Sequence, residues 1–237
     1  MTSKQPDGPT AGSRPPGRFL AFEGGDGAGK STQVELLAHW LRRWGLTALT
    51  TCEPGGTPLG VVLRELLLHS GHNLSPRAEA LLFAADRAQH VAHLVQPALS
   101  AGDWVITDRY VDSSIAYQGA GRRLDGAQIA QLSAWATDGL TPDLTVLLDV
   151  PTHVGAARRQ GRADRVESAP DAFHEQVRQG FRALAAAAPE RYLMLDATQS
   201  PEALAAAIRG RLEPWVQERR PNVAGDLVRQ DTAQEAR

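Results

Sequence analysis

The stretch FEGGDGAGKST, from Phe22 to Thr32, decides which fold the chain adopts. Gly24 is followed by four residues and then by Gly29, Lys30 and Ser31, which fits the phosphate-binding loop pattern GxxxxGK[ST]. An apolar run that favours a strand precedes the stretch, and apolar residues at helical spacing follow it. Because a phosphate-binding loop connects a strand to a helix, the surroundings agree with the pattern.

Each residue type in this loop suits phosphate binding for a chemical reason. Glycines let backbone N–H groups turn toward phosphate oxygens, and the start of the helix adds its partial positive charge. Lys30 is one of only two lysines in the chain, and it brings a compact charge where a planar guanidinium would be too bulky. The Ser31 hydroxyl can ligate Mg²⁺. The residues predicted to bind ATP are Gly24, Gly25, Asp26, Gly27, Ala28, Gly29, Lys30, Ser31 and Thr32.

Short apolar runs alternate with helical patterns along the rest of the chain. The predicted strands are residues 18–23, 47–52, 104–107, 144–150 and 192–195. The predicted helices are residues 34–41 with Gly45 as the C-cap, 59–68, 76–99, 126–136, 152–160, 170–187 and 201–215. The strands lack polar alternation, as buried parallel strands do. We therefore predict an α/β fold of the P-loop NTPase type, in which a doubly wound five-stranded parallel sheet carries helices on both faces and binds ligands beyond the carboxyl ends of its strands.

Composition limits the classes of partner. With 237 residues, a net charge of −2 and a pI near 6.4, the chain is predicted to be one domain with no bulk attraction to nucleic acid or anionic lipid. No segment reaches the length of a membrane span, so we expect a soluble, cytoplasmic protein with no membrane partner. Cys52 is the only cysteine, which excludes an internal disulfide and a cysteine-based metal site; we expect it to be a small buried residue.

The two ends of the chain differ in composition from the middle. Residues 1–17 are rich in Pro, Gly and small polar residues, and residues 218–237 are mostly polar. Neither segment has enough apolar surface to order itself, so both are predicted to be disordered tails. The folded domain is expected to cover residues 18–217.

A second candidate half-site follows the predicted strand WVIT. It is the stretch DRYVDSSIAYQG, residues 108–119, which begins with Asp108 and Arg109 at the strand end. Asp108 would orient Mg²⁺ or hold Arg109, and Arg109 would bridge the donor and acceptor phosphates. The alternative is a structural Asp–Arg cap with no chemical role.

With this stretch the chain resembles the thymidylate kinases of the bacterial type. Six motifs carry the resemblance in the family's order: FEGGDGAGKST, EPGGTPLG, LLFAADRAQH, DRYVDSSIAYQG, PDLTVLLDV and RRQGRADRVE. They fall within residues 18–215, so the resemblance covers nearly the whole predicted domain. It implies transfer of a phosphoryl group from ATP to dTMP with Mg²⁺, for dTTP biosynthesis, by a homodimer.

The resemblance also implies the acceptor site. Phe83 would stack on the thymine ring, and Arg87, one helical turn later, would contact the base or its phosphate. The full set implied to bind dTMP is Glu53, Arg64, Phe83, Arg87, Arg109, Ser114, Tyr117 and Gln118. In this set Arg64 would hold the acceptor phosphate, Ser114 and Gln118 would hydrogen-bond the base, and Tyr117 would pack by the deoxyribose. Without the motifs, each of these residues would be interpreted as an ordinary core residue or as a solvated polar residue.

The arginine-rich segment RRQGRADRVE, about residues 158–167, is implied to be a lid. Alone, such a run is usually a solvated basic face. Gly27 stands where another branch of the family has an arginine in the loop, so Arg158 or Arg162 is expected to close over the phosphates. The predicted catalytic residues are Lys30, Asp26, Arg109, Arg158 and Arg162, and the predicted Mg²⁺ ligands are Ser31 and Asp108.

Three points remain open from the sequence. Glu53 matches a family carboxylate near the reacting phosphates, but it could also act as a general base in a deoxynucleoside kinase. Cys52 directly before it departs from the family's usual arginine, so some positive charge beside the phosphates is missing or comes from elsewhere. A non-catalytic nucleotide-binding module is the alternative outside the enzymes.

Overall fold

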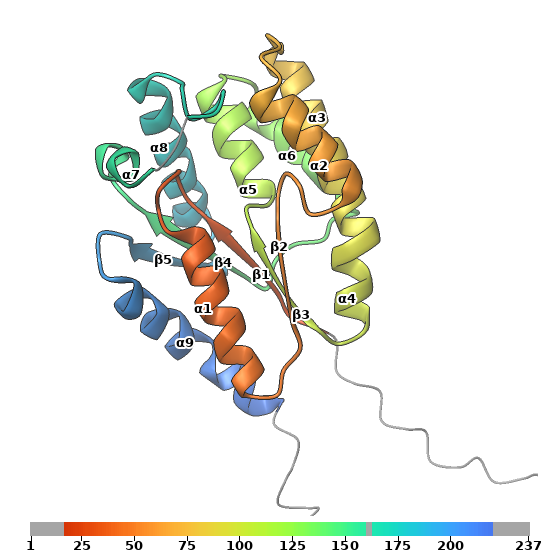
Figure 1. The fold of residues 1–237 in the computed structure, drawn as a ribbon, viewed down its shortest axis with the longest axis vertical. Coiled ribbons are helices and arrows are strands. Elements are labelled where there is room, and N and C mark those ends of the chain that lie inside the picture. The colour runs from red at the N-terminus through yellow and green to blue at the C-terminus, as the bar shows by residue number, and fades with distance from the viewer. Residues whose placement is uncertain (1–16, 160–162, 220–237) are drawn as a thin grey trace, which may run out of the picture.

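The computed structural model describes residues 17–159 and 163–219. Its centre is a sheet of five strands, which are β1 (Phe19–Glu23), β2 (Ala48–Cys52), β3 (Trp104–Asp108), β4 (Leu144–Asp149) and β5 (Tyr192–Asp196). The strands are all parallel and lie in the order β2-β3-β1-β4-β5 (Figure 1). The predicted fold class is therefore confirmed, and each strand agrees with its prediction to within one residue at either end. The predicted tails lie almost wholly outside the described residues.

Helical segments connect the strands. They are α1 (Lys30–Arg43), α2 (Pro58–Arg64), α3 (Pro76–His90), α4 (Gln96–Ser100), α5 (Val111–Ser114), α6 (Gly126–Ala136), α7 (Thr152–Arg158), α8 (Asp171–Ala187) and α9 (Pro201–Glu218). Three wider π-helical turns extend them, η1 (Glu65–His69) after α2, η2 (Val91–Val95) between α3 and α4, and η3 (Ile115–Gly121) after α5. A short 3₁₀ turn, η4 (Pro189–Arg191), precedes β5. The helix formed by α5 and η3 was not predicted from the sequence.

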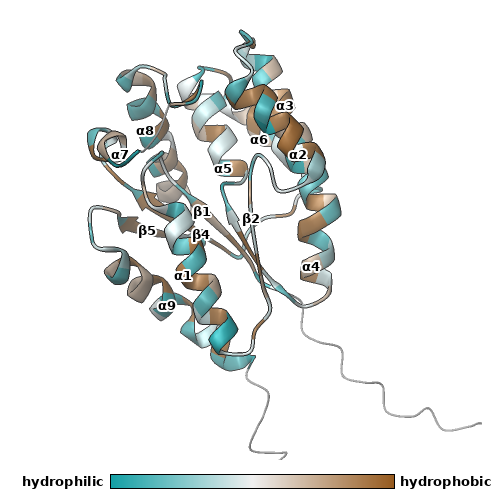
Figure 2. Cartoon of the chain, viewed as in Figure 1, coloured by the Kyte–Doolittle hydropathy of each residue, from teal (hydrophilic) through white to brown (hydrophobic). Residues whose placement is uncertain are grey.

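Two helical layers enclose the sheet. On one face α1 and α9 pack together and cover Leu20, Phe22 and Ile106 (Figure 1). On the other face Phe19, Ala21 and Val105 pack against η2 and α4, while Leu147 packs against η3 and α8. Figure 2 shows that the central strands are mainly hydrophobic. This two-sided burial explains why the strands lack polar alternation, and it leaves the carboxyl ends of the strands open for a site.

Two loop features follow directly from the sequence. Gly45 has a φ of +73° just after Trp44, the C-cap residue of α1, and its N–H donates to the Arg42 carbonyl, as expected for a helix-ending glycine. The Thr57, Ser75 and Ser200 side chains accept hydrogen bonds at the N-termini of α2, α3 and α9. In the described part of the chain, no helix is both long enough and apolar enough to cross a bilayer.

Candidate functional site

The phosphate-binding loop joins β1 to α1 as the sequence predicts. Gly24 and Gly29 have φ values of +134° and +92°, which residues with a Cβ atom rarely adopt. The Lys30 side chain is 7% exposed, and its Nζ atom donates to the carbonyl oxygens of Gly24 at 3.1 Å and Gly25 at 2.9 Å. The lysine side chain therefore binds two backbone carbonyl groups of its own loop.

Gly27 and Gly155 bring the loop and α7 into direct contact. Gly27 has a φ of +77°, and a Cβ atom added there would collide with the Gly155 carbonyl oxygen. A Cβ atom on Gly155 would in turn collide with the Asp26 carbonyl oxygen. Backbone packs on backbone here, so an arginine at position 27 has no room unless α7 moves.

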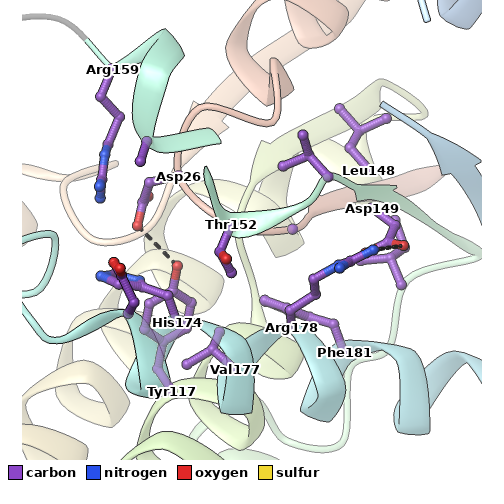
Figure 3. A pocket seen from close by; sticks show the side chains of 16 residues that line it. Asp26, Tyr117, Leu148, Asp149, Thr152, Arg159, His174, Val177, Arg178 and Phe181 are labelled. Carbon is purple, nitrogen blue, oxygen red and sulfur yellow. Dashed lines mark hydrogen bonds and ion pairs between the residues drawn. The ribbon is translucent and has the colours of Figure 1, made fainter. Parts of the chain in front are cut away.

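A wide pocket of about 770 Å³ opens in front of the loop, and we call it the loop pocket. Of the predicted ATP-binding residues it is lined by Asp26, Gly27, Ala28, Gly29, Lys30, Ser31 and Thr32. Gly24 and Gly25 instead line a small cavity of about 30 Å³ behind the loop, between α7 and α8 (Figure 3). The predicted metal ligands meet beside the loop pocket, since the Ser31 hydroxyl donates to Asp108 Oδ2 at 2.7 Å.

A second pocket of about 130 Å³ adjoins the first, and we call it the inner pocket. It is lined by all eight residues that the sequence implied for the acceptor nucleotide, Glu53, Arg64, Phe83, Arg87, Arg109, Ser114, Tyr117 and Gln118. They come from the loop after β2, from α2, α3 and the turn after β3, and from α5 and η3. Segments far apart in the sequence thus form one binding surface.

The two pockets meet at shared residues. Asp26, Glu53, Arg64, Arg109 and Glu167 line both. At this junction the Arg109 guanidinium pairs with Asp26, and the Tyr117 hydroxyl donates to Asp26 Oδ2 at 3.0 Å, as the dashed line in Figure 3 shows. The same side chains therefore face both pockets.

Comparison with known proteins agrees with this geometry. A sequence model of the family described as Thymidylate kinase matches residues 22–208. The chain belongs to the thymidylate kinase family. It is 54% identical over 203 residues to "Thymidylate kinase" of Clavibacter michiganensis subsp. michiganensis, covering 84% of this chain and 96% of that one. It is 55% identical over 197 residues to "Thymidylate kinase" of Cutibacterium acnes, covering 83% and 96%.

A solved structure of the family shows the same architecture. The crystal structure of thymidylate kinase from Ehrlichia chaffeensis superposes with a TM-score of 0.71 at 32% identity, covering 84% of this chain and 100% of that one. Membership of this family favours an enzyme over the non-catalytic binding module that the sequence left open.

Charge at the junction of the two pockets is fixed by burial and pairing. Burial alone would raise the pKa of Asp26, but Arg109 and Lys30 hold it well below the ordinary aspartate value. Burial would lower the pKa of Arg109, yet nearby Tyr117, Asp26 and Asp108 raise it. Asp26 therefore stays anionic and Arg109 cationic at any working pH.

Glu53 and Arg87 form a buried pair that the thymidylate kinase motifs did not reveal. Arg87 Nε donates to Glu53 Oε2 at 2.7 Å, and the guanidinium also donates to Ser114 Oγ at 3.1 Å and the Tyr110 carbonyl at 3.0 Å. His90 Nδ1 lies 2.8 Å from Glu53 Oε1. Both carboxylate oxygens of Glu53 are thus engaged, which weakens its case as a general base.

Arg64 and Cys52 both line the loop pocket. Arg64 Nη1 donates to the Pro54 carbonyl oxygen at 2.8 Å. Cys52 was expected to be a buried filler, but it is half-exposed and lines the loop pocket. The expectation was wrong because β2 is an edge strand of the sheet, which exposes the last residues of the strand to the site. Burial raises the pKa of the Cys52 thiol.

The arginines of the arginine-rich segment, residues 158–167, lie at different places around the site. Arg158, at the end of α7, lines the loop pocket and donates to the Ala197 carbonyl oxygen at 2.7 Å. Arg159 instead lines the small cavity behind the loop. Arg165 pairs with Glu79 on α3. Arg162 lies outside the described residues. Among the arginines of this segment that the structure describes, Arg158 is therefore the one that lines the loop pocket.

Sequence reasoning missed two residues beside the inner pocket, Glu79 and His90. Both lie on α3, and both are fully buried. Glu79 is four residues before Phe83 and His90 is three after Arg87. Their helical spacing places them on the same side of α3 as the predicted pair, so spacing was the one signal that could have identified them.

Replacing Asp86 by asparagine is expected to make stability less dependent on pH. Burial and the neighbouring Glu53 carboxylate raise the pKa of Asp86 to about 6, and Asp86 Oδ2 is buried without a hydrogen-bond partner. A raised carboxyl pKa adds stability at low pH, and this contribution disappears as pH rises from about 4 to about 6. Relative to wild type, Asp86→Asn should therefore gain roughly 2 kcal/mol between pH 4 and pH 7.5 in urea unfolding. A difference that does not change with pH would contradict this assignment.

Proposed function

We propose that this chain transfers the γ-phosphoryl group of ATP to dTMP and so forms dTDP and ADP. The observation that carries the proposal is the sharing of Asp26, Glu53, Arg64, Arg109 and Glu167 by the loop pocket and the inner pocket. ATP held by its phosphates at the loop would point its terminal phosphorus toward a nucleotide in the inner pocket. Juxtaposition of this kind supplies much of the rate in phosphoryl transfer.

The loop pocket would take ATP. Backbone N–H groups of the loop would bind the phosphate oxygens, and Lys30 would exchange its carbonyl partners for the β- and γ-phosphates. Ser31 and Asp108 fit Mg²⁺, because they bring two oxygen ligands together beside the phosphate loop, and Mg²⁺ is usually bound by one or two protein ligands together with phosphates and water. When bound there, Mg²⁺ would neutralise phosphate charge.

The inner pocket would take dTMP. Phe83 would stack on the thymine ring, Ser114 and Gln118 would hydrogen-bond the base, and Tyr117 would pack against the deoxyribose. Arg64 and Arg87 would face the acceptor phosphate. Arg87 is held in place from three sides by Glu53, Ser114 and Tyr110, so little side-chain freedom is lost when a ligand binds.

The transfer itself needs charge compensation more than proton removal. The second pKa of a phosphate monoester is about 6, so an oxygen of dTMP is already anionic at neutral pH. That oxygen would attack the γ-phosphorus while the bond to the β,γ-bridging oxygen breaks and ADP leaves. Arg109 lies between the pockets to stabilise the moving charge, and Arg158 is placed to do so from the loop pocket.

A comparison of dTMP with thymidine tests the proposal. ADP formation should rise with added dTMP and stay near background with thymidine, because Glu53 already accepts from Arg87 and His90 and is not free to take a hydroxyl proton. Turnover with thymidine but not with dTMP would favour the deoxynucleoside kinase and reject our assignment. No turnover with either substrate, while both nucleotides bind, would favour a non-catalytic module.

We further propose that the protein is a cytoplasmic homodimer. Exposed hydrophobic side chains gather on α2, α3 and α6, which pack next to one another. They are Leu59, Val61, Val62, Leu81 and Trp135. The hydrophobic colour on these helices is visible in Figure 2. An apolar surface of this kind is typical of a subunit interface, and light scattering of the purified protein would measure the mass directly.

A further inference from the structure

Glu79 on α3 is a buried carboxylate that contacts a side chain of the inner pocket. Glu79 is 1% exposed and does not line the pocket itself. Its Oε1 atom accepts a hydrogen bond of 2.8 Å from Nε2 of Gln118, which does line the pocket. In the proposed function Gln118 contacts the base of dTMP. A contact that sets the orientation of the Gln118 amide therefore also decides which atom of that amide faces the base.

Glu79 is itself held as a carboxylate. Arg122 donates to it from Nε at 3.2 Å and from Nη2 at 3.3 Å, and Arg165 Nη2 lies 2.7 Å from its Oε2 atom. Burial would raise the pKa of Glu79, but Gln118, Arg122 and Arg165 outweigh it and hold that pKa below the ordinary value. An ionised carboxylate has only acceptors, so it can face only the nitrogen end of the Gln118 amide.

This contact leaves the Gln118 amide with one orientation. Turning the amide over would place its oxygen against a carboxylate oxygen, which brings two acceptors together in a buried site. Among the described residues no hydrogen bond to the side-chain oxygen of Gln118, Oε1, is present, and Gln118 lines the inner pocket. The oxygen of Gln118 is thus the acceptor that remains available to a base.

We infer that Glu79 is a positioning residue that makes the inner pocket select pyrimidines with an N–H group at ring position 3. Thymine and uracil carry a hydrogen on N3 and can donate it to the Gln118 oxygen. Cytosine has an acceptor at N3, which would meet the Gln118 oxygen without a proton between them. The inference rests on the proposed function, because it needs the base to lie at Gln118.

The test compares kcat/KM for dTMP and dCMP in wild type and Glu79→Gln. The amide introduced at position 79 can either donate or accept, so it no longer dictates the orientation of Gln118. The preference for dTMP over dCMP should fall by about tenfold or more, mainly through KM, with kcat for dTMP changed less. Glu175→Gln is the matched control, because it alters an exposed Glu–Gln hydrogen bond on α8 and should leave the preference unchanged.

A swapped variant separates positioning from simple loss of stability. In Glu79→Gln/Gln118→Glu the amide at position 79 can donate to the carboxylate at position 118, which offers only acceptors to the base. The dTMP preference should return to at least the wild-type range, although the ion pairs of Arg122 and Arg165 with a carboxylate at position 79 are still missing. If E79Q keeps the wild-type preference, or if the folded double variant fails to regain it, the inference is overturned. Absence of dTMP-dependent ADP formation in wild type would instead overturn the proposed function.

Discussion

Lys30→Ala is expected to lower kcat by about a thousandfold. The Lys30 side chain is 7% exposed at the base of the loop pocket, and removing a buried charge that stabilises a transition state typically costs that much. The loss should appear mainly in kcat, because the loop N–H groups remain to bind ATP. Measurement of ADP release at saturating ATP and dTMP checks this.

Lys30→Arg separates charge from shape. Nζ of Lys30 already lies within 3.1 Å of two loop carbonyl oxygens, so a guanidinium would not fit without moving the loop. We expect this variant to lose nearly as much activity as Lys30→Ala. Lys4→Ala, a change of the only other lysine, is the control and should retain full activity. Near-normal rates for Lys30→Arg would contradict the shape argument, and near-normal rates for Lys30→Ala would contradict the role of the loop.

Phe83→Ala is expected to raise KM for dTMP by roughly 10- to 100-fold and to change KM for ATP by less than about twofold. The magnitude follows from the usual value of stacking between a base and an aromatic ring. Phe83 lines the inner pocket and does not line the loop pocket, so the two substrates should respond differently.

Phe83 also packs against a hydrophobic cluster, so a control for lost packing is needed. Leu82→Ala provides it, because Leu82 packs against the same cluster and lines neither pocket. Leu82→Ala should lower the melting temperature with little change in either KM. If Phe83→Ala raised both KM values equally, Phe83 would be a core residue and not a base-stacking one.

Features that depend on residues close together in the sequence could be predicted from the sequence. The phosphate loop is such a case, because strand, glycines and helix follow one another in the chain. The five strands were found because each is a short run with little polar alternation, and the three central ones, β1, β3 and β4, are buried on both faces. The motifs named residues that line the two pockets, although spacing alone could not show that the two pockets share residues.

The helix formed by α5 and η3 shows what local reasoning could not supply. Its sequence, VDSSIAYQGAG, contains β-branched residues, serines and glycines, which have low helix propensity. Tertiary contacts override this preference. Glu23 accepts hydrogen bonds from the N–H groups of Tyr110 and Ser113, which are 87 and 90 residues away in sequence, and η3 packs along α8.

Glu53 shows the same limit at the site. The family resemblance implied a carboxylate near the phosphates at this position, and Glu53 lines both pockets. Its partners Arg87 and His90 are 34 and 37 residues away, so no local pattern could show that both of its oxygens are engaged. Cys52 was misjudged for a similar reason, because exposure at a strand end depends on which strand forms the edge of the sheet.

A crystal structure with Mg²⁺, a non-hydrolysable ATP analogue and dTMP tests the central claim most directly. We predict that the β- and γ-phosphates lie against the loop and Lys30, and that thymine lies between Phe83 and Gln118. Arg109 should lie between the γ-phosphate and the dTMP phosphate, because it lines both pockets. A triphosphate bound away from the loop, or dTMP bound outside the inner pocket, would contradict direct transfer between the two pockets.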